Sequence, residues 1–379
     1  MKIAMIGLRG IPAKSGGVEN VVEHLAPLLV KLGVDVTVYC RNPYCKERPK
    51  EFKGVKLRYL PAINIKIGET ISHSTFSSLD SLFRNYDIVH YHAMANGLFS
   101  FIPKITGKKT IVTLHGLDWQ REKWGIAAKL FIKTSERLTC FFPDKVISVS
   151  EKIKNYYKTK YNKDIAFIPN GVDIFKPRAI HNLKRFGLKK DNYILFLSRI
   201  VPEKEVHTLI EAFKKINTNL KLVIAGDATH TEAYLERVKK LAGNDKRIIF
   251  TGPLYGDDKI EAFSNARLFI LPSTIEGMPI VLLEAMSFGL CPLTSNIEEN
   301  LDVIKDYGAS FKVRDVNDLK SKMEYLIKNP QITKKKGVIC KQVVKKDYQW
   351  EAIAKKTLAV YKEALKTERN INYPKNRID

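Results

Sequence analysis

Short apolar runs alternate with longer amphipathic stretches along the first half of the chain. Such runs, bounded by turn-forming residues, predict buried strands, and apolar residues three or four positions apart predict helices that pack one face inward. A helix from about Val18, for example, would place Val21, Leu25 and Leu28 on its apolar side. Strands are predicted at residues 2–6, 35–39, 55–59, 87–91, 110–114, 145–149 and 165–168. This alternation predicts a parallel, doubly wound sheet.

The second half repeats the alternation after a polar, irregular segment that extends to about Asp191. Strands are predicted at residues 193–197, 220–225, 247–250 and 267–271. Pro279 can start a helix that Gly289 can end, and a last helix is predicted at residues 351–365. The chain therefore contains a second α/β domain.

The composition is that of a globular protein, with 45% hydrophobic and 27% charged residues in a chain of 379. This length suits two domains that each bury a core. We find no run of eighteen apolar residues and no signal peptide, so we expect a cytoplasmic protein. The cysteines show no metal-binding spacing and are expected to be reduced thiols. They are Cys40, Cys45, Cys140, Cys291 and Cys340.

Two explanations fit the net charge of +24: an anionic partner, or an organism whose proteins are generally rich in lysine. The lysines are dispersed and no recognition motif accompanies them, so nucleic acid is not the expected partner. The segment 124–142 combines apolar residues and lysines at helical spacing. We interpret it first as a surface helix with its apolar side inward. The second interpretation is a peripheral contact with the anionic inner face of the cell membrane.

The most informative stretch is residues 271–289, a predicted strand end, a loop and a helix. Glu276 lies on the loop, and Glu284 lies eight positions later inside an otherwise apolar helix. A buried carboxylate needs a partner, and ligands of parallel sheets bind beyond the carboxyl ends of the strands. The free amides within 277–280 and the helix dipole favour negative charge in the same space. A hydroxyl-rich, negatively charged ligand would fit.

Two cations follow the first strand of the second domain. The apolar run 193–197 leads to Arg199 and, five positions later, to Lys204. Arginine offers a planar fork of donors and lysine a compact charge, so the pair suits a diphosphate.

Two loops of the first domain are further candidates. The glycine loop that ends at Gly16 and Gly17 suggests a phosphate cradle, although its spacing does not match Gly-x-Gly-x-x-Gly and a structural turn is the alternative. His115 follows a predicted strand at its carboxyl end, where it can hydrogen-bond a ligand. Asp118 either orients an acceptor or caps its loop.

Together these motifs resemble the family-four retaining glycosyltransferases of the GT-B fold. The pattern Glu-Gly-x-Pro-x4-Glu-Ala-Met at 276–286 is similar to the family signature. It is preceded, in family order, by Gly16-Gly17, His115-Gly116, the run Pro-Asn-Gly-Val-Asp at 169–173 and the pair Arg199-x4-Lys204. One position departs: Glu205 stands where a glycine usually follows the lysine, which puts the geometry of that loop in doubt.

The resemblance implies a role for each motif. In the family the first glutamate contacts the donor sugar and the second the nucleotide ribose, while the Arg-x4-Lys pair holds the donor phosphates. The loop that contains residue 254 would brace the nucleobase. The implied catalytic residues are Glu276, His115, Arg199 and Lys204. The implied donor-binding residues are Gly16, Gly17, Arg199, Lys204, Leu254, Gly277, Met278, Pro279, Ile280 and Glu284, and Asp118 is a weaker acceptor candidate.

The resemblance also implies the architecture. Two Rossmann-like domains would face each other across a cleft, and the C-terminal helix would cross back onto the first domain. We expect an acceptor domain at 1–175 with the helix at about 350–366, a linker at 176–189, a donor domain at 190–347 and a tail at 367–379.

The implied function is transfer of a hexose-type sugar, with retention, from a nucleotide diphosphate sugar to a saccharide or lipid-linked saccharide, in cell-surface polysaccharide synthesis. No further cofactor is expected. The pair Asp257-Asp258 resembles metal ligands but begins a predicted helix, so capping explains it better. The competing interpretations are a sugar-nucleotide epimerase of the same fold, a non-catalytic subunit of an assembly complex, and a nucleic-acid binder with salt-dependent affinity.

Overall fold

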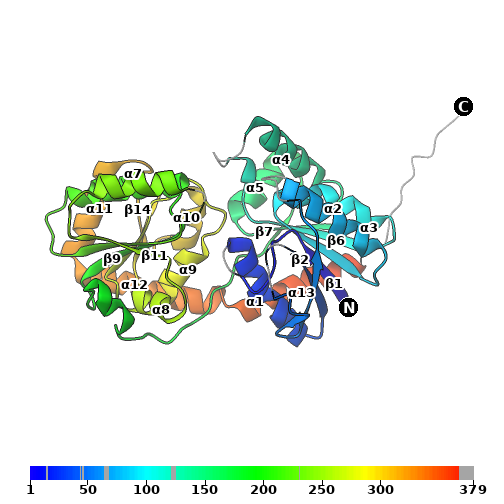
Figure 1. The fold of residues 1–379 in the computed structure, drawn as a ribbon, viewed down its shortest axis with the longest axis horizontal. Coiled ribbons are helices and arrows are strands. Elements are labelled where there is room, and N and C mark those ends of the chain that lie inside the picture. The colour runs from blue at the N-terminus through cyan, green and yellow to red at the C-terminus, as the bar shows by residue number, and fades with distance from the viewer. Residues whose placement is uncertain are drawn as a thin grey trace, which may run out of the picture. The chain divides into compact units, whose positions relative to one another are not determined.

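A computed structural model shows two parallel α/β sheets with helices on their faces (Figure 1). It describes residues 1–366 except 14–15, 43, 45–46, 64–67, 121–124 and 230. Cys45, part of the segment 124–142 and the expected tail therefore lie outside the described residues. The chain divides into two compact units, residues 1–113, 134–147 and 354–379, and residues 114–133 and 148–353.

The first sheet has eight strands in the order β3-β4-β2-β1-β5-β6-β7-β8. Each predicted strand is present within about two residues. β1, β2, β4, β5 and β6 pair in parallel, and the short β3 pairs antiparallel with β4. The strands are β1 Lys2–Ile6, β2 Asp35–Arg41, β3 Glu51–Phe52, β4 Val55–Leu60, β5 Ile88–His92, β6 Lys109–Leu114, β7 Lys145–Ser148 and β8 Ala166–Phe167. β1 lies in the middle of this order, and four of its five residues are fully buried.

Helices and 3-10 turns alternate with these strands. They are α1 Gly17–Lys31, α2 Gly68–Leu82, η1 Met94–Ser100, α3 Phe101–Lys104, η2 Asp118–Gln120, α4 Ile126–Leu138 and α5 Glu151–Tyr161. Local signals fix their ends. Ser150 caps α5 by accepting the Ile153 N–H, and Asn162 ends it in the left-handed conformation.

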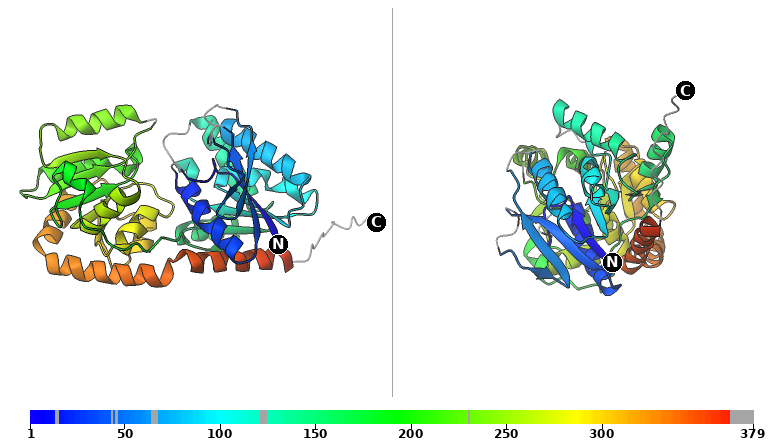
Figure 2. Two further views of the ribbon diagram at one scale, coloured as in Figure 1. Left: turned by 60° about the horizontal axis from the view of Figure 1, so that its bottom comes forward. Right: turned by 90° about the vertical axis from the view of Figure 1, so that its right-hand side faces the viewer.

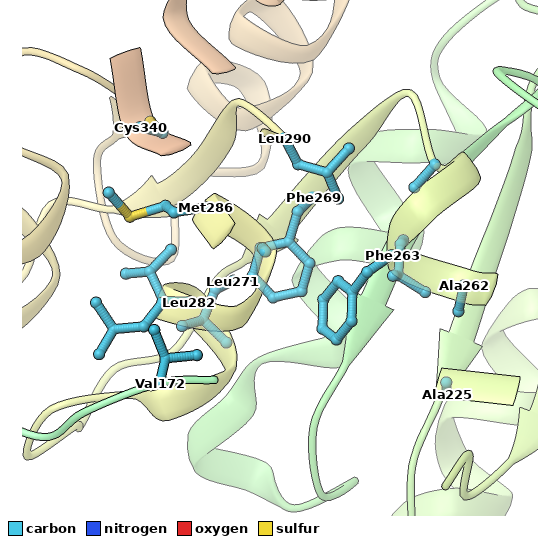
Figure 3. Close-up of a cluster of buried hydrophobic side chains, with 14 of the residues drawn as sticks. Val172, Ala225, Ala262, Phe263, Phe269, Leu271, Leu282, Met286, Leu290 and Cys340 are labelled. Atoms are coloured by element: carbon cyan, nitrogen blue, oxygen red, sulfur yellow. The ribbon is translucent and has the colours of Figure 1, made fainter. Parts of the chain in front are cut away.

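The second sheet is parallel throughout, in the order β11-β10-β9-β12-β13-β14. The strands are β9 Tyr193–Leu197, β10 Lys221–Ala225, β11 Ile248–Gly252, β12 Leu268–Leu271, β13 Pro292–Ser295 and β14 Ala309–Phe311. The first four were predicted and the last two were not. Apolar side chains from β9, β12 and α9 meet in one buried cluster, part of which Figure 3 shows.

The helices of this region follow the same alternation. They are η3 Asn182–Phe186, η4 Pro202–Lys204, α6 Val206–Lys214, α7 Glu232–Ala242, α8 Gly256–Asn265, α9 Ile280–Ser287, α10 Glu298–Ile304, α11 Val316–Lys328 and α12 Pro330–Asp347. Asp315 caps α11 by accepting the amides of Asn317 and Asp318. No helix in the described part of the chain is long and apolar enough to cross a membrane.

The last helix, α13, covers Trp350–Lys366, close to its predicted bounds. From Ala354 onward it belongs to the first unit, and the red helix in Figure 2 lies along that unit's sheet. Its buried Tyr361 hydroxyl lies 2.6 Å from Nδ1 of the buried His90 on β5. The prediction that the C-terminal helix returns to the first domain is therefore confirmed.

Candidate active site

The loop after β9 places two cations at the carboxyl end of the second sheet. The chain leaves β9 through Arg199 and the turn η4, which ends at Lys204. Glu205 then adopts the left-handed conformation, with φ 51° and ψ 39°. A glycine takes this conformation without strain, whereas another residue costs roughly 1 kcal/mol. The turn thus keeps the backbone conformation that favours glycine, although the residue is a glutamate.

The Glu205 side chain offsets this strain. Its buried carboxylate accepts a hydrogen bond from Thr208 Oγ1 at 2.7 Å and one from Arg314 Nε at 3.0 Å. His207 Nε2 lies 3.2 Å away. These contacts come from α6 and from the loop before α11, so the carboxylate joins the Lys204 turn to two neighbouring elements. None of them was foreseen from the sequence.

Glu276 lies opposite Lys204, and the Lys204 ammonium donates directly to its carboxylate. The two side chains are only 12% and 9% exposed. The backbone reinforces the contact because the Thr274 amide donates to the Glu203 carbonyl at 2.9 Å. A carboxylate and an ammonium that are this buried neutralise each other's charge, which makes their burial tolerable.

A small pocket of about 60 Å³ opens beside this ion pair. Its lining brings three predicted charged residues together: Arg199, Lys204 and Glu276. Gly277 completes this side of the pocket, and Glu284 is not among the described residues that line it. The cations and the first glutamate therefore converge on one hollow at the strand ends.

Glu284 lies within α9 and has a different partner. Its carboxylate accepts a hydrogen bond from Lys259 Nζ at 2.6 Å, and the two side chains are 11% and 29% exposed. Lys259 belongs to α8, which follows the loop that holds the buried Leu254. Sequence reasoning missed Lys259, because nothing in the spacing of α8 and α9 indicates which side chains meet.

The loop before α9 is held by a contact from Asn170. Pro279 is the extended residue before the helix, and Gly289 follows its end with φ +82°, both as predicted. Asn170, which belongs to the second unit like Met278, donates from Nδ2 to the Met278 carbonyl at 3.0 Å. The sequence indicated Asn170 only as part of the run Pro-Asn-Gly-Val-Asp, so this contact was missed. This contact holds the loop before Ile280, and the amides of that loop lie at the amino end of α9.

Gly277 is required by a close approach within the second unit. A Cβ added to Gly277 would lie 1.8 Å from the carbonyl oxygen of His115, a residue of the same unit. Any side chain at Gly277 would therefore displace one of the two loops. The close approach brings the His115 backbone next to the glutamate loop, and the half-buried Asp118 begins η2 three residues later.

Gly16 and Gly17 lie in the first unit, at the start of α1. Gly16 has φ 107° and ψ 140°, which only glycine adopts readily, and a Cβ there would lie 2.1 Å from Glu19 Oε2. Glu19 Oε1 accepts the Arg9 amide at 3.0 Å. Glu19 thus holds the glycine loop from the first turn of α1, a role that the sequence pattern did not indicate.

The pKa of carboxyl groups in this region is shifted in both directions. Burial raises the pKa of Glu299, on α10, above its usual range, and the negative charge of Glu276 adds to the rise. Hydrogen bonds from Arg185 and Asn182 lower the pKa of Asp258. Asp258 lies 2.6 Å from Arg185 and therefore stays ionised as the partner of that arginine. Asp257 pairs in the same way with Arg178 at 2.5 Å.

Two family models match the chain. The model described as Glycosyltransferase Family 4 matches residues 15–175, and the model described as Glycosyl transferases group 1 matches residues 181–339. The chain belongs to the family-four glycosyltransferases. The first match contains Gly16, Gly17 and His115, and the second contains both cations and both glutamates of this glycosyltransferase.

Curated relatives cover most of the glycosyltransferase chain. The UDP-Gal:alpha-D-GlcNAc-diphosphoundecaprenol alpha-1,3-galactosyltransferase of Escherichia coli is 27% identical over 86% of this chain and 87% of its own. The N-acetyl-alpha-D-glucosaminyl L-malate synthase of Bacillus anthracis is also 27% identical, over 76% of this chain and 77% of its own.

Solved structures share the fold. Sucrose-phosphate synthase from Thermosynechococcus elongatus superposes with a TM-score of 0.83 at 19% identity, covering 96% of this chain and 98% of its own. HepE from Anabaena, solved with UDP and glucose, gives a TM-score of 0.80 at 16% identity, covering 96% and 100%. The predicted fold class, GT-B with two parallel-sheet domains, is confirmed.

Proposed function

We propose that this glycosyltransferase moves a hexose from a nucleoside diphosphate sugar to an acceptor hydroxyl and retains the configuration at the anomeric carbon. The observation that carries the proposal is the pocket in which Arg199, Lys204 and Glu276 meet at the ends of β9 and β12. In this assignment residues 190–347 bind the donor and residues 1–175 bind the acceptor.

The charges in the pocket suit the chemistry of the leaving group. As the bond between the anomeric carbon and the diphosphate breaks, negative charge grows on the departing oxygen. Arg199 and Lys204 neutralise it, and the amino end of α9 adds a favourable dipole. Lys204 would then move away from Glu276. The freed Glu276 carboxylate accepts hydrogen bonds from hydroxyls of the sugar and stabilises the positive charge that develops on the sugar ring.

The acceptor oxygen attacks from the same face as the leaving diphosphate, which is how retention arises in this assignment. The acceptor proton passes to the leaving diphosphate, so no protein nucleophile is required. His115 holds the donor sugar and Asp118 orients the acceptor. Glu284 accepts hydrogen bonds from the ribose hydroxyls. Gly16 and Gly17 are assigned to donor binding, and Leu254 lies in the loop assigned to the base.

We propose a UDP-linked hexose and a lipid-linked saccharide as the substrate classes to test first. The E. coli relative supports both, because its name specifies UDP-Gal as donor and a diphosphoundecaprenol-linked sugar as acceptor. The name of the second relative contains L-malate and no lipid-linked sugar, so other acceptor classes are tested as well. The product would serve cell-surface polysaccharide synthesis.

The test is a thermal-shift screen of the purified protein against UDP, GDP and ADP sugars, because a ligand that binds the native state raises Tm. The best donor is then incubated with and without lipid-linked acceptors, and the product linkage is determined by NMR. We expect transfer with retention and only slow donor hydrolysis without acceptor. An inverted linkage, or an epimerised sugar nucleotide in place of transfer, would contradict the proposal.

We further propose that the first unit rests on an anionic membrane, at the inner face of the cell membrane. Three large apolar side chains are strongly exposed there: Phe83 at 87%, Ile105 at 73% and Phe141 at 70%. Their segments lie together, since Lys104 Nζ donates to the Phe142 carbonyl at 2.9 Å and Lys108 Nζ to the Leu82 carbonyl at 3.2 Å. The partly exposed Lys104 lies at the edge of this apolar surface, and a cation beside exposed apolar side chains suits anionic lipid.

Helix α4 also combines exposed apolar side chains with an exposed lysine. Ala128 and Ile132 are buried, as an inward apolar side requires, but Ile126 and Leu130 are 89% and 66% exposed. The exposed Lys133 lies on the same helix. The amphipathic pattern thus accounts for only part of the apolar residues of α4.

Sedimentation with vesicles tests this contact. We expect the wild type to bind vesicles that contain phosphatidylglycerol and not vesicles of phosphatidylcholine alone. The triple variant Phe83→Ser, Ile105→Ser, Phe141→Ser should lose most of this binding, whereas Tyr325→Ser, at an exposed site of the second unit, should not. Equal binding by both variants would contradict the proposed surface.

A further inference from the structure

The pairing of Lys259 with Glu284 is the starting point. Glu284 is the only charged residue of the apolar helix α9, and its side chain is 11% exposed. Among the described residues, only Lys259 donates to its carboxylate, at 2.6 Å to Oε1. A carboxylate has two oxygens and can accept about four hydrogen bonds, so the lysine occupies only part of its capacity.

The position of Lys259 on α8 needs an explanation. It is the fourth residue of that helix, close to the amino end, where the helix dipole disfavours a cation. The acidic residues of the same turn do not account for it, because Asp257 and Asp258 pair with Arg178 and Arg185. Glu284 is therefore the group that stabilises the ammonium at this place.

The surroundings of the pair connect it to the donor. Lys259 follows the loop of Leu254, which the proposed function assigns to the base, and Glu284 is the carboxylate that it assigns to the ribose. Lys259 is partly exposed, at 29%, so the pair lies at the edge of the buried core and not inside it. A lysine that holds Oε1 fixes the carboxylate plane and leaves Oε2 to accept from a second donor.

We propose that Lys259 is a positioning residue that orients Glu284 toward the ribose hydroxyls and so makes the site select ribonucleotide donors. The inference rests on the proposed function, because it presumes a nucleotide at this site. Without Lys259, Glu284 loses its fixed orientation, and the hydrogen bonds to the ribose weaken. Contacts to the diphosphate, which depend on Arg199 and Lys204, should not change.

The experiment is calorimetric titration of the full chain with UDP and with 2′,3′-dideoxy-UDP, which lacks both ribose hydroxyls. The corresponding GDP and ADP pairs are run in parallel, since the base is not assigned. The wild type should bind the ribonucleotide about tenfold more tightly, as expected for hydrogen bonds to a charged group. Lys259→Met should remove most of that preference and leave the affinity for the dideoxy compound unchanged.

Matched variants separate orientation from folding. Lys259→Arg should restore most of the preference, and Lys259→Met combined with Glu284→Gln should bind no worse than Glu284→Gln alone. Lys239→Met is the control, because Lys239 forms a comparable lysine–glutamate pair with Glu236 at 2.9 Å on α7. Melting curves of all variants show whether each one is folded.

The outcomes distinguish the two levels of the proposal. If Lys259→Met weakens both nucleotides equally, or neither, while Glu284→Gln abolishes the ribose preference, the role of Lys259 is wrong and the donor site stands. If Glu284→Gln leaves the ribose preference intact, or if no nucleoside diphosphate binds the wild type, the assignment of Glu284 in the proposed function fails, and the role of Lys259 fails with it.

Discussion

The carboxylates beside the glycine loop and those of the candidate site have different kinds of partner. In the first unit, Glu19 and Glu23 of α1 accept backbone amides of the preceding loop, from Arg9 at 3.0 Å and from Ala13 at 2.8 Å. In the second unit, Glu276 and Glu284 accept the ammonium groups of Lys204 and Lys259. The first arrangement joins side chain to backbone, and the second joins two side chains.

The difference indicates what each region can do. A backbone amide cannot leave its place unless the loop moves, so the α1 glutamates hold the loop in one shape. A lysine can rotate away toward a phosphate and release its carboxylate to a hydroxyl. We infer that the first region is built for shape and that the second is built to exchange partners when a ligand binds.

The largest expected effect comes from Glu276→Ala. If Glu276 stabilises the reacting sugar, its loss should lower kcat by about 10²–10³-fold, the range for removing one group that stabilises a transition state. Steady-state transfer assays with the best donor measure this, and a melting curve checks the fold. A variant that keeps full turnover would end the assignment of Glu276. Glu298→Ala, at an exposed residue of α10, is the control.

Lys204→Ala should have the next largest effect, on binding. The loss of a charge-assisted contact to the diphosphate is worth about 2 kcal/mol, or roughly thirtyfold in Kd. Titration with UDP and with uridine separates this contact from those to the base and ribose, because uridine lacks the phosphates. The affinity for uridine should not change. An equal loss for both ligands would show that Lys204 acts on the fold of the loop.

Much of the fold could be predicted because most strands are recognisable from their own residues. β9 and β12 are uniformly apolar, and all of their residues except Leu197 are buried. Pro279 and Gly289 mark the ends of α9. Three strands were missed. β3 has two residues and β14, Ala309–Phe311, has three, and β13, Pro292–Ser295, contains a proline, a threonine and a serine. Burial of polar residues depends on the neighbouring strands, which periodicity does not specify.

The candidate site was predictable only in part. Arg199, Lys204 and Glu276 could be placed at strand ends from the sequence, and they line one pocket. Lys259 and Asn170 could not, since their contacts with Glu284 and Met278 join elements far apart in the chain. Residue spacing reveals which end of a strand a side chain occupies, whereas long-range pairs follow from packing.

The paired glycines offer a sharper test of the shape-holding region. Gly16→Ala should destabilise the protein by about 1–3 kcal/mol, because it combines an unfavourable backbone conformation with a Cβ 2.1 Å from Glu19 Oε2. Gly17→Ala is the matched control, since its Cβ would have no described atom within 4 Å apart from its chain neighbours and the backbone of its own helix. Chemical denaturation of both variants measures the difference. Equal free energies of unfolding would show that the Glu19 side chain does not constrain the glycine loop.

The smallest expected effect concerns Glu205, where the two kinds of arrangement meet. Glu205→Gly removes the backbone strain but also the contacts to Thr208 and Arg314, so the free energy of unfolding should change by less than about 1 kcal/mol. Glu205→Ala loses the same contacts and keeps the strain, so it should be about 1 kcal/mol less stable than the glycine variant.

The same pair of variants shows what positions Lys204. If the turn conformation alone is responsible, Glu205→Gly should bind UDP within about threefold of the wild type, because glycine adopts a φ of 51° readily. We expect this result, since the Glu205 carboxylate contacts α6 and Arg314 and not Lys204 itself. A tenfold loss of UDP affinity would instead show that the Glu205 carboxylate helps to hold Lys204 in place. Side-chain contacts of Glu205 would then contribute to the candidate site in addition to the two lysine–glutamate pairs.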